Sequence, residues 1–159
     1  MRVIRKMRSE DIPHVSELLC DCYRWLAEKE GYTESQLRWL LTDRGSIPTV
    51  ERESKTQFYL IAHQAESITG MVAIRANEIT KLYVAPEHHR EGIGEMLFIA
   101  AEQEIRTNGY HEMHLGATDT AIPFYQKMGM TLTGRVPYRV DIFPGRRVAI
   151  MTKYWQRNE

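Results

Sequence analysis

The sequence contains very little cysteine, since Cys20 and Cys22 are the only two among its 159 residues. They lie two positions apart in a segment with helical spacing, so they cannot readily form a disulfide with each other, and a metal site would need other ligands. The chain also lacks a signal peptide and any apolar run long enough to cross a bilayer. We therefore expect two small buried thiols in a soluble, cytoplasmic protein without a membrane contact.

An excess of either charge is absent as well. The 21 lysines and arginines balance the 21 aspartates and glutamates, so the strongly basic surface of a nucleic-acid-binding protein is not expected. No Gly/Ser- or Pro-rich linker and no repeat divides the chain, and its 43% hydrophobic content suffices for one core. A single domain over residues 1–159 is predicted.

A metal-binding pattern is also missing. His111 and His114 flank Glu112, but the metalloprotease spacing is four residues, and a strand would point the two imidazoles to opposite faces. No metal site is predicted.

What the chain does have is a glycine-containing turn between two regular elements. Residues 82–97, LYVAPEHHREGIGEML, predict a strand, a turn and an amphipathic helix that ends near Asn108–Gly109. The first N–H groups of a helix lack partners and carry a partial positive charge, so this turn can bind a phosphate group. Gly92 and Gly94 remove the Cβ atoms that would keep the ligand off the backbone. A tight turn without a ligand is the alternative.

The spacing of these glycines excludes the better-known nucleotide loops. A Walker loop needs Gly-Lys-Ser/Thr, whereas Glu95 follows Gly94. A dinucleotide fingerprint needs a third glycine and a later acidic residue, which Ala100 and Glu112 do not supply convincingly. A ligand other than a nucleoside triphosphate or NAD is indicated.

The strand end, Pro86 and the loop from His89 to Gly94 together resemble the GNAT superfamily of N-acetyltransferases. In that family an R/Q-x-x-G-x-G/A loop binds the pyrophosphate of acetyl-CoA. His89 stands where the family usually has Arg or Gln, a departure that leaves the main-chain cradle intact, and Arg90 next to it supplies a cation. The resemblance implies contacts to acetyl-CoA from Leu82, Val84, His89, Arg90, Gly92, Ile93, Gly94, Glu95 and Thr118.

A second motif lies further along the chain. Residues 121–130, AIPFYQKMGM, resemble the A-x-x-F-Y-x-K-x-G-F helix and turn of the same family, with Met130 in place of the final Phe. Thr118 stands where the family often has Asn. With weaker support from strand and helix patterning, the resemblance covers nearly the whole chain and implies the acyl-CoA N-acyltransferase fold.

The hydrophobic patterning is compatible with that fold, because it predicts strands and helices in the order βααβββαβαββ. Thr33 and Gln36 form a capping box for the second helix, whereas residues 45–55 predict a loop with at most a short helical turn. We expect an α+β fold with a single mixed, mostly antiparallel sheet flanked by helices. The predicted strands are residues 2–7, 58–62, 68–74, 78–84, 112–116, 132–141 and 147–154, with a turn at Pro144–Gly145 before the last strand.

The resemblance also implies the reaction, which is direct transfer of an acetyl group from acetyl-CoA to a primary amine of a small molecule, peptide or protein. Tyr125 stands where the family places the tyrosine that protonates the departing thiolate, and a packed aromatic residue is the alternative. Glu78 is the candidate base, acting directly or through water, and His114 is its rival. The main chain of Leu82 and Val84 is expected to pair with the pantetheine arm.

The acceptor is less well defined. The resemblance implies a groove lined by residues 23–45 and 135–147, where Tyr23, Trp25, Tyr32 and Trp39 are either lining or core residues. Charges in the first region are mixed and select no substrate. The arginines of the second are expected to solvate a sheet edge, and attraction of an acidic acceptor or of the CoA phosphates is the alternative. A non-catalytic CoA-binding sensor, an acyltransferase with a longer acyl chain, and assembly as a homodimer stay open.

Overall fold

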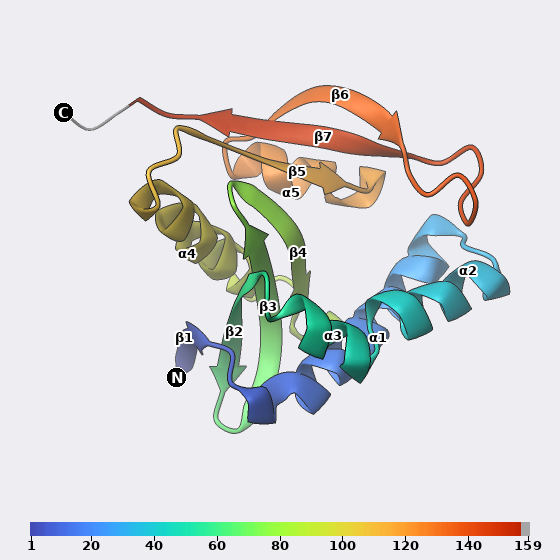
Figure 1. Ribbon diagram of the computed structural model, residues 1–159, viewed down its shortest axis with the longest axis horizontal. Helices are drawn as coiled ribbons and strands as arrows, with labels where there is room; N and C mark the ends of the chain where they lie inside the picture. Colours follow the sequence, from blue (N-terminus) through green and yellow to red (C-terminus); the bar gives the residue numbers. More distant parts are fainter. Residues whose placement is uncertain (157–159) are drawn as a thin grey trace.

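The computed structural model describes residues 1–156 (Figure 1). Its strands form one sheet in the order β1-β2-β3-β4-β5-β7-β6, in which only the β4–β5 neighbours are parallel. This arrangement confirms the expected α+β fold with a mixed, mostly antiparallel sheet. The strands are β1 (Arg2–Lys6), β2 (Phe58–Gln64), β3 (Ser67–Arg75), β4 (Glu78–Val84), β5 (Glu112–Ala117), β6 (Thr131–Pro137) and β7 (Arg147–Tyr154).

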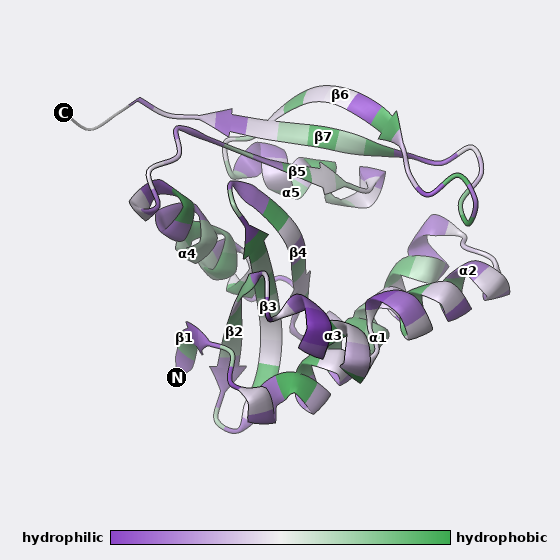
Figure 2. Cartoon of the chain, in the orientation of Figure 1, coloured by the Kyte–Doolittle hydropathy of each residue, from purple (hydrophilic) through white to green (hydrophobic). Residues whose placement is uncertain are grey.

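Helices cover both faces of the sheet. The core divides accordingly, because α4 and α5 pack in one hydrophobic cluster and α1 packs in the other. Figure 2 shows hydrophobic residues concentrated in the central strands β2–β4. In the part of the chain described here, no helix has the length and apolar character needed to cross a membrane. The helices are α1 (Ile12–Glu30), α2 (Glu34–Trp39), α3 (Ile47–Glu53), α4 (Ile93–Thr107) and α5 (Ile122–Lys127).

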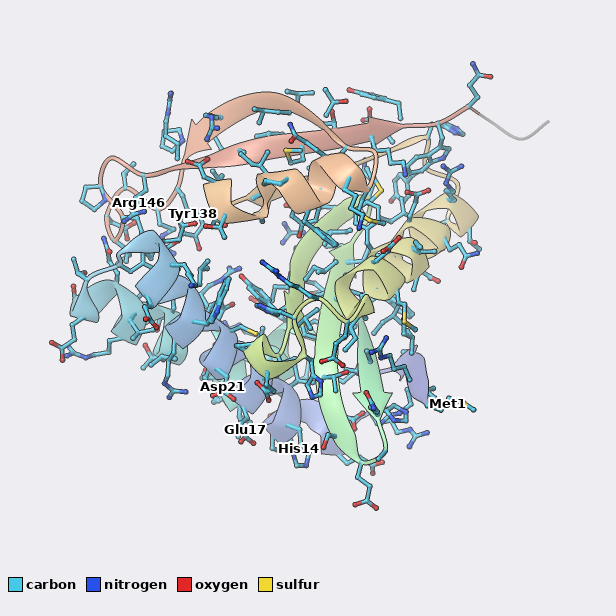
Figure 3. All side chains as sticks on the ribbon, turned by 180° about the vertical axis from the view of Figure 1, so that it is seen from behind. Met1, His14, Glu17, Asp21, Tyr138 and Arg146 are labelled. Atoms are coloured by element: carbon cyan, nitrogen blue, oxygen red, sulfur yellow. The ribbon has the colours of Figure 1, made fainter. Side chains whose placement is uncertain are left out.

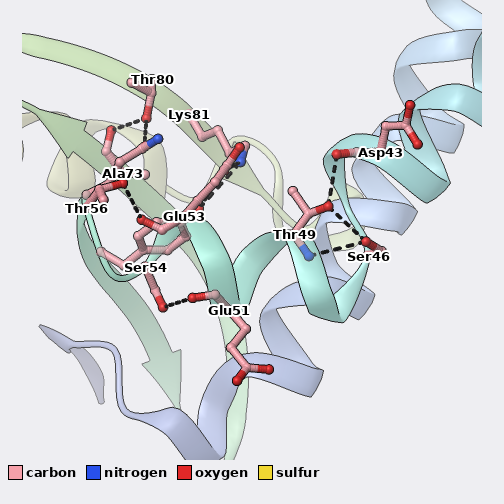
Figure 4. A network of polar contacts seen from close by, with 12 residues as sticks. Asp43, Ser46, Thr49, Glu51, Glu53, Ser54, Thr56, Ala73, Thr80 and Lys81 are labelled. Atoms are coloured by element: carbon pink, nitrogen blue, oxygen red, sulfur yellow. Dashed lines mark hydrogen bonds and ion pairs between the residues drawn. The ribbon is translucent and has the colours of Figure 1, made fainter.

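The segment between α2 and β2 is more helical than predicted. The capping box of Thr33 and Gln36 at the start of α2 is confirmed; the helix then continues as a π-helical turn (Leu40–Arg44), and α3 occupies most of residues 45–55, where a loop with at most a short helical turn was expected. The Ser46 hydroxyl accepts a hydrogen bond from the Thr49 N–H at 3.4 Å and so caps α3 (Figure 4). This short polar helix escaped prediction because it presents too few apolar positions to show a period.

The closing hairpin also differs from the prediction. β6 ends at Pro137 rather than continuing to residue 141, because residues 138–146 leave the strand and fold against the α1–α2 corner. Phe143, 1% exposed, anchors this connection between Tyr32 and Trp39, with ring centroids at 5.0 and 5.8 Å. The turn at Pro144–Gly145 lies within the connection as expected.

The feature that positions the site is a split between β4 and β5. These strands are in register only at Glu78 and His114, beyond which β4 bends away (Figure 1). On its other side β4 pairs with β3, where the Ala85 N–H donates to the Thr69 carbonyl at 2.8 Å. Since peptide groups alternate between the two edges of a strand, those of Leu82 and Val84 face the split and have no strand partner there.

Candidate active site

The loop before α4 forms a concave backbone surface. Gly92 caps α4 with φ of +83°, and Arg90 is also in the left-handed region with φ of +66°. Such backbone turns direct N–H groups toward a common centre, which suits an anion. A Cβ on Gly94 would lie 3.4 Å from Cζ of Phe124, in van der Waals contact with that ring. The predicted glycine-containing turn before a helix is therefore confirmed, and its binding of a phosphate group stays a prediction.

This loop is held in place by a carboxylate. Glu91 accepts hydrogen bonds from Nη2 of Arg2 at 3.2 Å and pairs with Nδ1 of His88 at 2.9 Å, and Arg2 also donates to the Glu91 carbonyl. The negative charge of Glu91 is thus engaged away from the cradle. Arg2 belongs to β1, 89 positions earlier, so no local sequence signal could have assigned it to the loop.

The His89 side chain contacts β4 and α1 rather than the concave surface. Its Nε2 lies 3.0 Å from the Val84 carbonyl oxygen, and its ring meets Trp25 edge-on with centroids 4.8 Å apart. The imidazole, with its proton on Nε2, thereby ties the loop to the end of β4. The departure from the family pattern at this position gives the side chain a positioning contact.

A cavity of about 610 Å³ crosses the split in the sheet. Gly94, Phe124 and Tyr125 line it on the α4–α5 face, and Cys22 and Trp25 of α1 line it on the other. The residues that the resemblance assigned to the cofactor all line this cavity, although their role stays a prediction; they are Leu82, Val84, His89, Arg90, Gly92, Ile93, Gly94, Glu95 and Thr118. The exposed amine of Lys127 lies beside them and was not predicted.

Tyr125 is buried at 7% exposure, with its ring against those of Phe124 and Phe98 at centroid distances of 5.1 and 6.2 Å. Burial raises the pKa of Tyr125, and Tyr83 adds to the effect. The phenol therefore stays protonated at neutral pH and can donate a proton to a group in the cavity. Both the predicted acid and the alternative, a packed aromatic residue, are compatible with this environment.

The two candidate bases lie at the apex of the split. The Glu78 carboxylate accepts a hydrogen bond from Nη2 of Arg75 at 2.8 Å, and His114 faces Glu78 in the β4–β5 register. Within residues 1–156, neither is among the side chains that line the cavity. Either residue would thus reach the reacting amine through water. Nor does any cluster of three or more metal-ligating side chains occur among the described residues.

A buried charged cluster next to the cavity was not predicted. Lys81 of β4, 3% exposed, lines the cavity and forms an ion pair with Glu53 of α3 (Figure 4). The Tyr59 hydroxyl donates to the same Glu53 carboxylate at 3.1 Å. Burial lowers the pKa of Lys81, and the Glu53 carboxylate opposes that shift. A lysine within an apolar strand was the only sequence signal for this contact.

The split sheet and the glycine cradle at its opening define an acyl-CoA N-acyltransferase fold. Residues 32–142 match the family model described as an acetyltransferase (GNAT) domain, so the chain belongs to the GNAT acetyltransferase family. It is 27% identical over 124 residues to N-acetyltransferase 8 of Homo sapiens, a match covering 70% of this chain and 55% of that protein. The chain thus spans about half the length of this relative. It is 25% identical over 138 residues to spermidine N(1)-acetyltransferase of Thermoplasma acidophilum, covering 79% and 86% of the two chains.

Solved structures show the same fold. A GCN5-related N-acetyltransferase from Rhodopseudomonas palustris superposes with a TM-score of 0.86 at 21% identity, covering 98% of this chain and 96% of that one. The PaiA N-acetyltransferase of Thermoplasma acidophilum, crystallised with coenzyme A, gives 0.82 at 22% identity and covers 98% and 99%.

The exposures of the two partners predict an asymmetric effect of mutating the Lys81–Glu53 pair. The Lys81 side chain is 1% exposed and that of Glu53 is 20% exposed, so Glu53→Gln strands a buried cation, whereas Lys81→Met leaves a carboxylate that water and Tyr59 can reach. We expect Glu53→Gln to lower the free energy of unfolding by about 2–4 kcal/mol and Lys81→Met by less than about 1 kcal/mol. Urea denaturation measures both.

The Lys81–Glu53 pair also determines how the loss of stability in Glu53→Gln depends on pH. In Glu53→Gln, burial without a counter-charge depresses the folded-state pKa of Lys81, so the unfolded state binds the proton more tightly. The loss of unfolding free energy in Glu53→Gln is therefore largest at low pH, and it shrinks as the pH rises above the folded-state pKa of Lys81. Equal losses in the two variants, or a deficit that grows with pH, would contradict this account.

Proposed function

We propose that this protein transfers an acetyl group directly from acetyl-CoA to a primary amine. The observation that supports this most is the cavity across the β4–β5 split, because both family motifs line it, one on the loop before α4 and one on α5. A cavity lined from both faces of a sheet offers room for two substrates to meet at the split. Spermidine, the substrate named for the Thermoplasma acidophilum relative, is one amine to test.

The residues present fit a coenzyme A thioester. The N–H groups at the start of α4 would hold its diphosphate, with Arg90 and Lys127 as nearby cations. The Leu82 peptide group and the Val84 N–H would pair with the extended pantetheine arm as with an additional strand, whereas the Val84 carbonyl is held by His89. A backbone N–H at this edge would also polarise the thioester carbonyl. When bound, acetyl-CoA supplies the acetyl group as an activated thioester.

The reaction needs two proton transfers, one from the acceptor amine and one to the departing thiolate. A primary amine with a pKa near 10.4 is only about 0.1% neutral at pH 7.4, a handicap of roughly 4 kcal/mol, so removing its proton is the larger task. Glu78 performs it through water in this proposal, since its carboxylate is held by Arg75 outside the cavity lining. The departing thiolate costs only about 1–2 kcal/mol at neutral pH, and Tyr125 protonates it.

If the loop before α4 binds the diphosphate, substitution of its glycines should weaken cofactor binding. A control glycine with a similar backbone conformation separates this effect from backbone strain. Gly92→Asp and Gly94→Asp should abolish binding of acetyl-CoA and of CoA in a calorimetric titration, because they bring a side chain and a negative charge to the diphosphate. Gly109→Asp is the matched control for Gly92→Asp. Both glycines have positive φ, +83° and +91°, and open space around a Cβ. Equal loss of affinity in Gly109→Asp would rule out the cradle as the cause.

Removal of the Tyr125 hydroxyl tests the proposed acid. Tyr125→Phe keeps the packing against Phe124 and Phe98, so acetyl-CoA should bind with nearly unchanged affinity while kcat falls about tenfold to a hundredfold, at or below the low end of general acid catalysis. Steady-state kinetics together with titration measure both quantities. Tyr154→Phe, on a residue 68% exposed, is the control. A Tyr125→Phe enzyme as fast as the parent protein would show that Tyr125 is a packed aromatic residue and not the acid.

The base is tested by the pH dependence of the rate. Glu78→Gln should lower kcat/KM and remove the acidic limb of its pH profile if this carboxylate relays the amine proton. Arg75→Gln breaks the same ion pair but keeps the carboxylate, so its profile should keep that limb. An unchanged profile in Glu78→Gln would transfer the role to His114 or to water alone.

A further inference from the structure

A second polar site lies on the α1 face of the sheet, beyond Tyr83 of the cavity lining. Arg44 is the last residue of the π-helical turn and is half-buried. Its guanidinium forms no ion pair within 4.0 Å with any carboxylate in the described residues 1–156. Glu53, the carboxylate whose charge acts on it, is already engaged by Lys81 and Tyr59. A poorly solvated cation is thus left without a counter-ion.

Tyr23 adds an unsatisfied hydroxyl at the same place. It is 1% exposed, and its buried oxygen has no partner with hydrogen-bond geometry among the residues described, although Arg44 is near enough to attract it. Its ring meets that of Tyr83 edge-on with centroids 5.3 Å apart. Buried hydroxyls in proteins normally have a partner, so the Tyr23 hydroxyl retains hydrogen-bonding capacity that a ligand atom next to Arg44 could use.

The surroundings of Arg44 favour its charged form. Burial opposes the charge, but coulombic attraction to Tyr23, Tyr138 and Tyr83 when these are ionised, and to the Glu53 carboxylate, raises the pKa of Arg44 above its usual value. Tyr138 comes from the β6–β7 connection, which Figure 3 shows facing the helical layer. Burial raises the pKa of Tyr23 and of Tyr83, so these two phenols stay neutral and can donate or accept hydrogen bonds but cannot neutralise the guanidinium.

The other cations near Arg44 are already engaged by partners of their own. Lys81 is paired with Glu53, whereas Arg139 pairs outward with Asp141 at 2.8 Å and Arg146 contacts the Glu30 carbonyl at 2.6 Å. Two of the hairpin arginines expected to solvate an edge are thus already engaged, whereas Arg44 has no ion pair within residues 1–156 and is available to a ligand. A planar guanidinium binds a carboxylate or phosphate through paired hydrogen bonds.

We propose that Arg44 and Tyr23 bind an oxyanion of the acceptor, so that the substrate is a primary amine that also carries a carboxylate or phosphate group. This inference rests on the proposed function and narrows its acceptor. It places the amine at the β4–β5 split and the anion toward the π-helical turn, with Tyr83 between them. A polycation such as spermidine would meet Arg44 with like charge and is a poor substrate in this proposal.

The test compares acceptors that differ only in the anion. The probes are ω-amino carboxylates from glycine to 6-aminohexanoate, their carboxamides, and aminoalkylphosphonates of the same lengths, assayed with acetyl-CoA. We expect at least one anionic amine to exceed its neutral carboxamide in kcat/KM by about tenfold or more, as for a charge-assisted hydrogen bond. The carboxylate and phosphonate arms show which oxyanion the site accepts.

Two variants connect this preference to the site. Arg44→Gln should reduce the acid-to-amide ratio to near one, and the control Arg38→Gln, on an α2 arginine whose side chain is 69% exposed, should leave it unchanged. Tyr23→Phe should raise KM for the anionic amine alone, with little change in the melting temperature, because within residues 1–156 its hydroxyl has no partner of good hydrogen-bond geometry to lose. A melting temperature that falls in Tyr23→Phe, with an unchanged KM, assigns the hydroxyl to structure and overturns its part.

A second readout does not depend on turnover. The preferred anionic amine, or 5-aminopentanoate if none is turned over, is titrated into the CoA-saturated protein, and binding should be lost in Arg44→Gln. Carboxamides used as well as acids, with a ratio that Arg44→Gln does not move, overturn the oxyanion site while the acetyltransferase proposal stands. If acetyl-CoA does not bind and no amine is acetylated, the proposed function fails, and titration of the amine without CoA still decides whether Arg44 binds anions.

Discussion

One hydrogen-bonded contact between two parallel strands governs the rest of the molecule. β4 and β5 meet at Glu78 and His114 and then separate, although each remains fully paired with its other neighbour. The sheet therefore stays continuous while one internal edge is left open. An exposed strand edge in a core would normally be costly, because its peptide groups have lost water. Here the open edge lines a cavity, where those groups can bind a ligand instead.

The two faces of the sheet use this opening differently. On the α4–α5 face the backbone provides the binding groups, and glycine keeps side chains away from them. On the α1–α3 face the polar groups are side chains, the Lys81–Glu53 ion pair and the Arg44 and Tyr23 side chains of the proposed oxyanion site. A backbone cradle suits a part of a ligand that is always the same, whereas side chains can differ from one protein to another. The two faces of the sheet therefore differ in whether the backbone or the side chains provide the polar groups.

Local patterns were enough to predict the elements on the first face. β4 and β7 have the predicted bounds, and Gly92 and Gly94 lie where the motif put them, because each signal is contained within a few residues. The second face could not be predicted in the same way. Lys81 and Glu53 are 28 positions apart and Arg2 and Glu91 are 89 apart, so only the fold brings them together. The available aromatic signals were also ambiguous, since Trp25 lines the cavity whereas Tyr23 is buried in the core.

The π-helical turn between α2 and α3 has a consequence for how this fold can diversify. The Gly45 N–H donates to the Leu40 carbonyl at 2.9 Å, five positions earlier, so the turn holds one residue more than an α-helical turn would. Loss of a single residue there would restore the ordinary helical repeat and rotate the adjoining residues by about 100°, the angle between successive residues on a helix. A one-codon deletion could thus exchange the side chain offered to the acceptor while the strands, the cradle and the cavity beneath keep their positions.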